Sequence, residues 1–219
     1  MRYPALRAPA SVVAGLALLA ALVVAITLRP SGPALAQGPA SSRYAILADR
    51  SEVRYRVREQ LVGLSFPNDA VGATTAVRGT VAFDAQGRVV PGGSRFTVDL
   101  RTLKSDEERR DNYLRRNTLE TERYPTVTFV PTEARGLPFP LPQTGSIPFD
   151  LVGDLTVKDA TRRVTWAATA SFDGPQVTIQ ARTAFHFGDF GLQQPRVRVV
   201  LSVEDDIKLE ADLTLRRSS

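Results

Sequence analysis

The sequence of 219 residues predicts an all-β domain, built either as a closed antiparallel barrel or as a two-sheet sandwich. From Tyr44 onward, apolar and polar residues alternate with a period of two, which is typical of strands that bury one face only. Short segments rich in Gly, Pro and Asp separate the alternating runs, as turns do. Eight such one-sided runs must bury their apolar faces against one another, which a barrel or a sandwich achieves.

Residues 1–36 carry the pattern of a secretory signal peptide. Arg2 and Arg7 precede an uncharged apolar run at 12–28, and Ala34-Leu35-Ala36 supplies a cleavage site with small residues. An uncleaved membrane anchor is the alternative, because 17 residues reach the lower edge of bilayer-spanning length. Residues 37–43 then form a linker and residues 44–217 one domain. We expect that domain to be periplasmic or secreted, or held at the membrane by the N-terminal segment.

The expected strands follow one another along this domain. The last one is the clearest, because Ile207, Leu209 and Leu213 alternate with Lys208 and Glu210, whereas a helix would distribute these residues around its axis. The eight runs lie at 52–58, 77–83, 96–100, 127–129, 149–157, 164–172, 177–187 and 207–215.

One short helix is expected after the third of these strands. Residues 105–108 read as a capping box, in which the Ser105 hydroxyl accepts from the Glu108 amide and the Glu108 carboxylate reaches back. Residues 118–123 add a second short turn, which Pro125 ends. Two pairs of opposite charge have i, i+4 spacing on the helix: Asp106 with Arg110, and Asp111 with Arg115.

The composition excludes several classes of site. The absence of cysteine excludes disulfides, thiolate metal sites and cysteine nucleophiles. The single histidine, His186, alternates with inward-facing phenylalanines and is expected to face solvent. Residues 1–36 hold three arginines and no acid, so the rest of the chain has 25 basic against 23 acidic residues and little support for nucleic-acid binding. We expect no catalytic residues, no metal site and no cofactor.

Four segments resemble the YceI-like, polyisoprenoid-binding family. They are DEERRDNYL at 106–114, ERYPTVTF at 122–129, GDLTVKDAT at 153–161 and DFG at 189–191. The resemblance covers about residues 44 to 215 in family order. It implies an eight-stranded, lipocalin-like antiparallel barrel that holds a long isoprenoid chain, such as that of a polyprenyl lipid or a quinone, in its lumen. Arg50, the Asp159-Ala160 turn and the long Pro-rich loop after Arg135 depart from the family pattern, near the expected barrel mouth.

The inward-facing rows supply the expected ligand-binding residues. Small residues in these rows, such as Gly79, Gly153 and Ala181, leave room between aromatic side chains, which favours a tunnel over a filled core. The expected lining is Tyr55, Val81, Phe83, Phe96, Val98, Phe129, Phe149, Leu151, Trp166, Ala168, Ala170, Ile179, Ala181, Phe185 and Phe187.

Several alternatives stay open on the sequence alone. The inward aromatics can form a packed core without a ligand, as in a scaffold or interaction domain. An outer-membrane barrel would turn the same apolar rows toward lipid. Arg54, Arg56 and Arg58 either dock an anionic membrane surface or, as we favour, lie beside Glu210 and Asp212 because the first strand pairs with the last. The sequence does not predict an oligomeric state.

Overall fold

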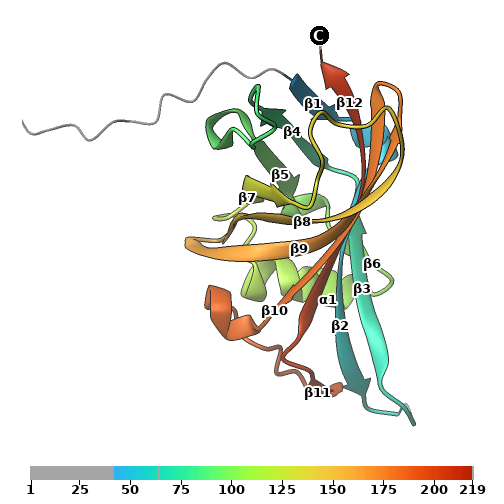
Figure 1. Cartoon of the computed structure of the whole chain (residues 1–219). Helices are drawn as coiled ribbons and strands as arrows, with labels where there is room; N and C mark the ends of the chain where they lie inside the picture. Colours follow the sequence, from blue (N-terminus) through green and yellow to red (C-terminus); the bar gives the residue numbers. More distant parts are fainter. Residues whose placement is uncertain (1–41, 64, 219) are drawn as a thin grey trace, which may run out of the picture. The chain divides into compact units, whose positions relative to one another are not determined.

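A closed ring of eight antiparallel strands organises the computed structural model, which describes residues 42–63 and 65–218 (Figure 1). Each strand pairs with the next, and β1 pairs with β12 to close the ring. This confirms the predicted barrel, whereas the expected signal segment at 1–36 lies outside the described residues. In spatial order the ring is β1 (Ser42–Ile46), β4 (Val77–Phe83), β5 (Arg95–Asp99), β7 (Thr126–Arg135), β8 (Thr144–Val157), β9 (Ala160–Asp173), β10 (Gln176–Phe185) and β12 (Ile207–Ser218).

Further strands extend the sheet beyond the ring. They are β2 (Glu52–Leu61), β3 (Asn68–Thr74), β6 (Lys104–Ser105) and β11 (Val200–Val203). β12 pairs with β1 through its C-terminal end and with β2 through its N-terminal half, so β1 and β2 act as two parts of one bent strand. The bend contains η1 (Ala48–Arg50), and the buried Ser51 hydroxyl holds it by donating to the Leu47 carbonyl at 2.7 Å.

The sequence pattern did not reveal β3, and its residues explain why. The inward positions of this strand hold Ala70, Gly72 and Thr74, which are buried but do not form an apolar row. β3 nevertheless pairs with β2 over seven residue positions, because Tyr55 and its neighbours supply the apolar side chains on that face. A strand made of small residues therefore cannot be recognised from its own sequence pattern, because its partner strand supplies the apolar side chains.

The expected helix is present, but the expected capping box is wrong. α1 (Glu108–Tyr113) is capped by Glu107, whose carboxylate accepts from the Arg109 amide at 3.0 Å. The carboxylate that reaches back belongs to Asp111 and accepts from the Ser105 amide at 2.9 Å and from its hydroxyl at 2.7 Å. Asp111 is buried against the half-buried Ser105 and does not pair with Arg115, whereas the Asp106–Arg110 pair forms at 2.6 Å.

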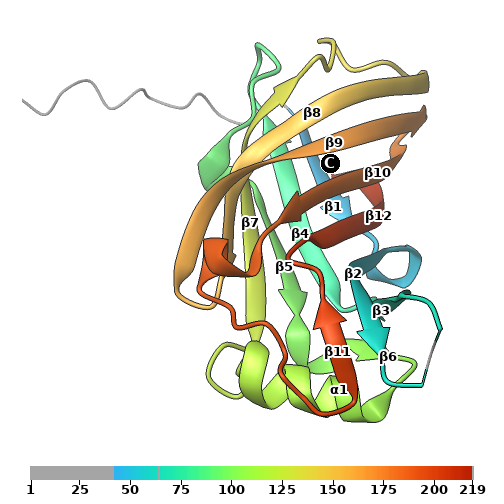
Figure 2. The same ribbon diagram turned by 90° about the horizontal axis from the view of Figure 1, so that it is seen from below.

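Short helical turns complete the chain. α1 continues into the π-helical turn η4 (Leu114–Thr118), and the two lie beside the ends of β5 and β7 (Figure 2). The remaining turns are η2 (Pro91–Gly93), η3 (Leu100–Thr102) and η5 (Phe187–Phe190). Within the described part of the chain, no helix combines the length and the apolar character needed to cross a bilayer.

The apolar rows of the strands face the barrel interior. On β12, Ile207, Ala211 and Leu213 are buried, whereas Lys208 between them is exposed. The same alternation holds on β10, where Val177 and Ala181 are buried and Thr178 is exposed. Apolar residues therefore point inward and charged residues outward, which is opposite to the arrangement of an outer-membrane barrel.

The arginine row of β2 is paired with acids on the outer face of the sheet, as the favoured alternative predicted. Arg54 contacts Glu210 at 3.3 Å and also Asp212, both on β12, and Arg56 contacts Glu210 at 3.4 Å. Burial raises the pKa of Glu210, but the two arginines lower it by more, so the net shift is downward. These arginines are therefore neutralised within the sheet and do not form a free basic surface.

Candidate functional site

An apolar cavity lies inside the barrel. Its volume is about 210 Å³, and nearly all of its lining surface is apolar. Strands β2, β5, β7, β8, β9, β10 and β12 supply most of the walls, and the segment around α1 and η4 supplies one end. A cavity of this lining repels water and accepts an apolar molecule.

Ten of the expected binding residues line this cavity. They are Tyr55, Phe96, Val98, Phe129, Leu151, Trp166, Ile179, Ala181, Phe185 and Phe187. The other five, which are Val81, Phe83, Phe149, Ala168 and Ala170, do not line it and are buried with 7% exposure or less. Contact of any of these side chains with a ligand stays a prediction.

The five remaining residues belong to the buried core, and Phe149 and Ala168 also border a separate hollow at the surface of β8, β9 and β10. In the core, Phe83 meets Tyr44 of β1 edge to face, with ring centroids 6.4 Å apart. Ala170 is 1% exposed on β9, and Phe172 beside it in the same inward row is also buried. Some inward-facing residues are thus packed in the core and others line the cavity. Alternation predicts that a side chain faces inward but not which of these two environments it enters.

Of the small residues expected to leave room, Ala181 lines the cavity, but Gly79 and Gly153 do not. A Cβ atom on Gly153 would lie 2.7 Å from the Phe129 ring, and one on Gly79 would lie 2.7 Å from the Phe96 ring. Neither glycine lines the cavity. Both positions are small because a neighbouring aromatic ring covers the backbone, which is a common way to protect a glycine in a sheet.

Those aromatic rings form one wall of the cavity. Phe96 and Phe129 are stacked with centroids 6.4 Å apart, and Phe129 meets Trp166 edge to face at 6.0 Å. Offset and edge-on contacts of this kind are favourable and fix the orientation of each ring. The wall spans β5, β7 and β9.

The sequence analysis missed the end wall of the cavity. Leu100 and Leu103 precede α1, and Leu114, Thr118 and Leu119 lie on or directly after η4. The local sequence carries only a weak signal, because Leu114 and Thr118, four positions apart, share one side of a helical segment, but Thr118 is polar. The sequence pattern therefore did not indicate that this segment lines the cavity.

A buried ion pair fastens this end wall to the barrel. The Arg110 guanidinium of α1 lies 2.7 Å from the Glu59 carboxylate of β2, and their side chains are 15% and 8% exposed. Glu59 continues the inward row of Val53, Tyr55 and Val57. The helix is thereby held against the inner face of β2.

Three polar atoms interrupt the apolar lining. The Tyr55 hydroxyl, the Thr118 hydroxyl and the Trp166 indole nitrogen are buried. The Thr118 and Trp166 atoms have no hydrogen-bond partner among the described residues, whereas the Tyr55 hydroxyl lies near Ser105. Burial raises the pKa of Tyr55 to about 12, although nearby Arg110 opposes the shift, so the hydroxyl remains protonated at neutral pH. A buried donor without a partner is unfavourable, and a ligand oxygen can supply one.

The geometry contains no metal site in the described ranges, where no group of three or more His, Cys, Asp or Glu side chains is placed to hold an ion. His186 is exposed, as expected from its position in the alternating run, and its ring contacts the Asp205 carbonyl outside the cavity. The hydrogen bond with that carbonyl raises the pKa of His186.

Comparison with known proteins gives both sequence and fold matches. A model of the YceI-like domain matches residues 44–215. UPF0312 proteins are similar: that of Pseudomonas putida F1 is 31% identical over 114 residues, and that of Pseudomonas fluorescens SBW25 is 29% identical over 141 residues. These alignments cover 48% and 60% of this chain and 56% and 68% of the relatives. The chain thus spans little more than half the length of the first relative.

Three solved structures share the fold at low sequence identity. A polyisoprenoid-binding domain from Saccharophagus degradans, implicated in plant cell wall breakdown, has a TM-score of 0.62 at 10% identity, covering 80% of this chain and 98% of that one. BcnA of Burkholderia cenocepacia has a TM-score of 0.57 at 18% identity, covering 77% and 98%. A YCEI protein of Campylobacter jejuni has a TM-score of 0.57 at 16% identity, covering 73% and 91%.

Proposed function

Because the chain belongs to the YceI-like domain family, we propose that its barrel binds a long isoprenoid-type lipid, such as a polyprenyl lipid or a quinone. The protein then acts by binding, as a carrier or a sequestering protein, and not by catalysis. The observation that carries this proposal is the apolar cavity, which ten of the expected binding residues line.

The energetics suit an apolar chain. Burial of each isoprene unit contributes about 2 kcal/mol or more, before the cost of ordering the chain. The aromatic wall of Phe96, Phe129 and Trp166 offers flat surfaces for the branched methyl groups of such a chain. The lining residues include no paired nucleophile and base, so their arrangement suits binding better than chemistry on the lipid.

The fold likeness supports the same ligand class by analogy. The structure from Saccharophagus degradans is described as a polyisoprenoid-binding domain, and its fold covers most of this chain. At 10% identity the likeness concerns the fold, so the choice of ligand rests on the cavity of this chain.

An extracytoplasmic location is part of the proposal and rests on the sequence of residues 1–36. Their basic start, apolar run and small-residue exit support export. Fractionation of cells followed by N-terminal sequencing of the purified protein tests it. A mature N-terminus after Ala36 supports cleavage, and a chain that remains in the cytoplasm contradicts the proposal.

Native mass spectrometry of the purified protein, followed by lipid extraction, tests the ligand. We expect a bound mass that extraction identifies as an isoprenoid-type lipid. Ala181→Phe fills the cavity and should abolish this mass, whereas Ala184→Phe, on the same strand but exposed, should keep it. Circular dichroism confirms that both variants are folded. A wild-type protein that takes up no isoprenoid lipid, or a folded Ala181→Phe protein that binds as well as wild type, overturns the proposal.

A further inference from the structure

One end of the barrel exposes a cluster of large apolar side chains. Val62, Phe66, Val199 and Leu201, here called the apolar end, are 56%, 80%, 60% and 66% exposed. They are four of the five large apolar side chains found exposed among the described residues. Such residues are ordinary when scattered singly, whereas a cluster marks an interaction surface.

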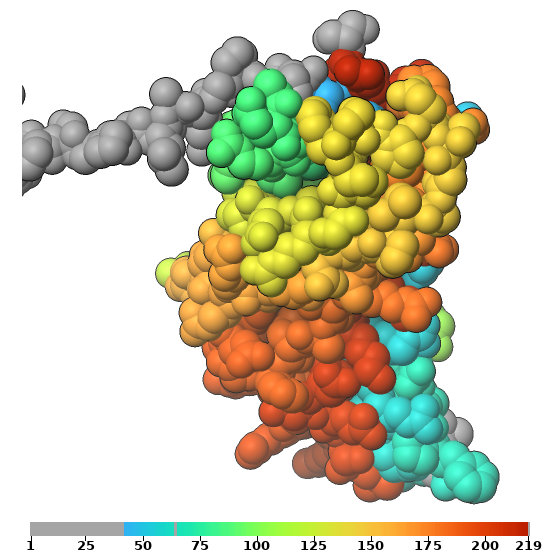
Figure 3. Space-filling model, viewed as in Figure 1, coloured from blue at the N-terminus to red at the C-terminus, as the bar shows by residue number. Residues whose placement is uncertain are grey.

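The two segments that make up the apolar end are direct neighbours. The Val62 amide donates to the Val199 carbonyl at 3.0 Å, and Val200 pairs with Leu61 where β11 joins β2. The hairpin end of β2 and β3 lies beside β11 in both ribbon views (Figures 1 and 2). In the space-filling view, this hairpin end projects from the lower end of the barrel (Figure 3).

The charge near the apolar end is positive. The sequence from 61 to 67 has no charged residue, and that from 191 to 199 has Arg196 and Arg198 but no acid. Both arginines are exposed. The exposed acids Glu204 and Asp205 follow β11 on the side away from Val199, where the Glu204 amide donates to the Arg58 carbonyl at 2.8 Å. On β3, Asp69 is neutralised by Arg56 and Arg58, each 3.2 Å away. Protruding apolar side chains with arginines beside them are suited to the interface of an anionic bilayer.

A second copy of the chain is a poorer partner for this surface. In a two-fold dimer, the same patch faces itself, so the arginines of one copy would approach those of the other. Like charges brought together in this way oppose association. Lipid phosphates, in contrast, pair with arginine, and the hydrocarbon beneath them accepts Phe66 and Leu201.

We propose that the apolar end docks the protein on an anionic membrane surface. This surface is distinct from the arginine row of β2, whose charges are paired within the sheet. The connection between β10 and β11 carries Arg196 and Arg198, and it also supplies Phe187 and Leu192 to the cavity wall. Docking therefore brings a segment of that wall to the bilayer. The inference does not depend on the ligand, because an empty barrel presents the same apolar end.

The absence of cysteine in the sequence allows a local test in the full chain. In Ser65→Cys, a polarity-sensitive fluorophore reports on the apolar end, and in Thr178→Cys it reports on an exposed site on β10. We mix each labelled protein with vesicles of phosphatidylcholine containing phosphatidylglycerol. We expect a blue shift at position 65 and none at 178, and a smaller shift when salt is added, because salt screens the arginines.

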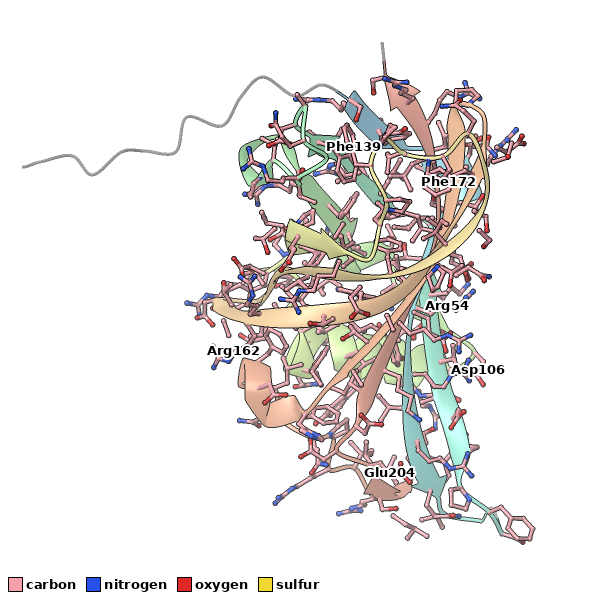
Figure 4. All side chains as sticks on the ribbon, in the orientation of Figure 1. Arg54, Asp106, Phe139, Arg162, Phe172 and Glu204 are labelled. Atoms are coloured by element: carbon pink, nitrogen blue, oxygen red, sulfur yellow. The ribbon has the colours of Figure 1, made fainter. Side chains whose placement is uncertain are left out.

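Matched substitutions identify the side chains responsible. Phe66→Ser should reduce the shift of the label at position 65, and loss of one buried aromatic side chain corresponds to roughly tenfold weaker docking. Phe139→Ser makes the same change at an exposed phenylalanine that lies far from Glu204, the residue after β11, and should leave the shift unchanged (Figure 4).

The label also distinguishes the membrane from other partners. A shift at position 65 that appears without vesicles as the protein concentration rises shows self-association and overturns the proposal. The proposal is also overturned if the emission of the label at position 65 does not change when vesicles are added. This holds even if the protein sediments with the vesicles, because the N-terminal segment alone could bind them. A shift that Phe66→Ser leaves intact contradicts the assignment to the apolar end.

Discussion

Single residues decide both what the cavity can hold and what the sequence could reveal about it. The pattern placed Tyr55 and Trp166 inward correctly, because period-two alternation fixes which face a side chain takes. It could not show that the Tyr55 ring covers Gly72, where a Cβ would lie 2.3 Å from the ring, because that contact joins two strands. It also could not show that Val81 and Phe83 point into a filled region, since filling depends on neighbours distant in sequence.

The covered glycine of β8 gives a stability prediction. Gly153→Ala should lower the free energy of unfolding by about 1–3 kcal/mol, because the new methyl group would meet the Val130 carbonyl oxygen at 2.4 Å and the Phe129 ring. Gly188→Ala is the control, since no atom lies within 4 Å of its Cβ, and should change stability by less than about 0.5 kcal/mol. Urea denaturation measures both, and equal effects would contradict the packing described.

The unpartnered hydroxyl in the end wall gives a second prediction. Thr118→Val keeps the side-chain shape and removes a buried hydroxyl without a partner, so the empty protein should become more stable by about 1 kcal/mol. If the bound lipid carries an oxygen that meets this hydroxyl, its affinity should fall. Thermal unfolding with and without extracted lipid measures both effects. Loss of stability in the empty protein would show that the hydroxyl has a partner.

At the level of elements, the helix that closes the cavity depends on charges that the local sequence only partly reveals. The Asp106–Arg110 spacing was visible, but the Arg110–Glu59 contact joins residues 51 positions apart. The capping role of Asp111 was also hidden, because a carboxylate that looked exposed on a helix is buried against Ser105. Local spacing predicts that a helix forms, whereas tertiary contacts decide which of its residues hold it in place.

The buried pair between α1 and β2 gives a third prediction. Arg110→Leu should destabilise the protein by about 3 kcal/mol, because the Glu59 carboxylate is then buried without its partner. The double change of Arg110→Leu with Glu59→Leu should recover most of this loss, since apolar pairs often replace buried ion pairs at little cost. Denaturation of the four proteins in a double-mutant cycle measures the coupling. Additive losses would show that the two side chains do not interact.

At the level of the whole molecule, a barrel and seven of its eight ring strands were predictable, whereas β1 and the bends were not, because the first predicted run, 52–58, is β2. Each predicted run corresponds to a strand of the sheet, because one-sided burial leaves a mark in the sequence. The interruption between β1 and β2 leaves no such mark, since it depends on the Ser51 side chain and on the Thr214 amide that donates to it at 3.0 Å. The extent of the cavity depends on which inward side chains meet across the barrel, and contacts between residues distant in sequence leave no mark in the sequence pattern.

The outer charges give a prediction on the scale of the whole barrel. Hydrogen bonds from arginines outweigh burial and lower the pKa of Asp69 below its ordinary value of 3.8 and that of Glu210 below its ordinary 4.5. The unfolded state therefore binds more protons in this range, and the stability from these groups is present above about pH 4.5 and is lost as the pH falls below 4. Urea denaturation between pH 7 and pH 2 measures this loss. It should be smaller in Asp69→Asn, and an identical acid profile would contradict the contribution of Asp69.

The pairing of β1 with β12 has a consequence for biosynthesis. β1 and β12 close the barrel although they lie far apart in the sequence, so a nascent chain lacks this seam until β12 has left the ribosome. A shortened chain that ends before Ile207 should remain open and susceptible to proteases throughout its lifetime.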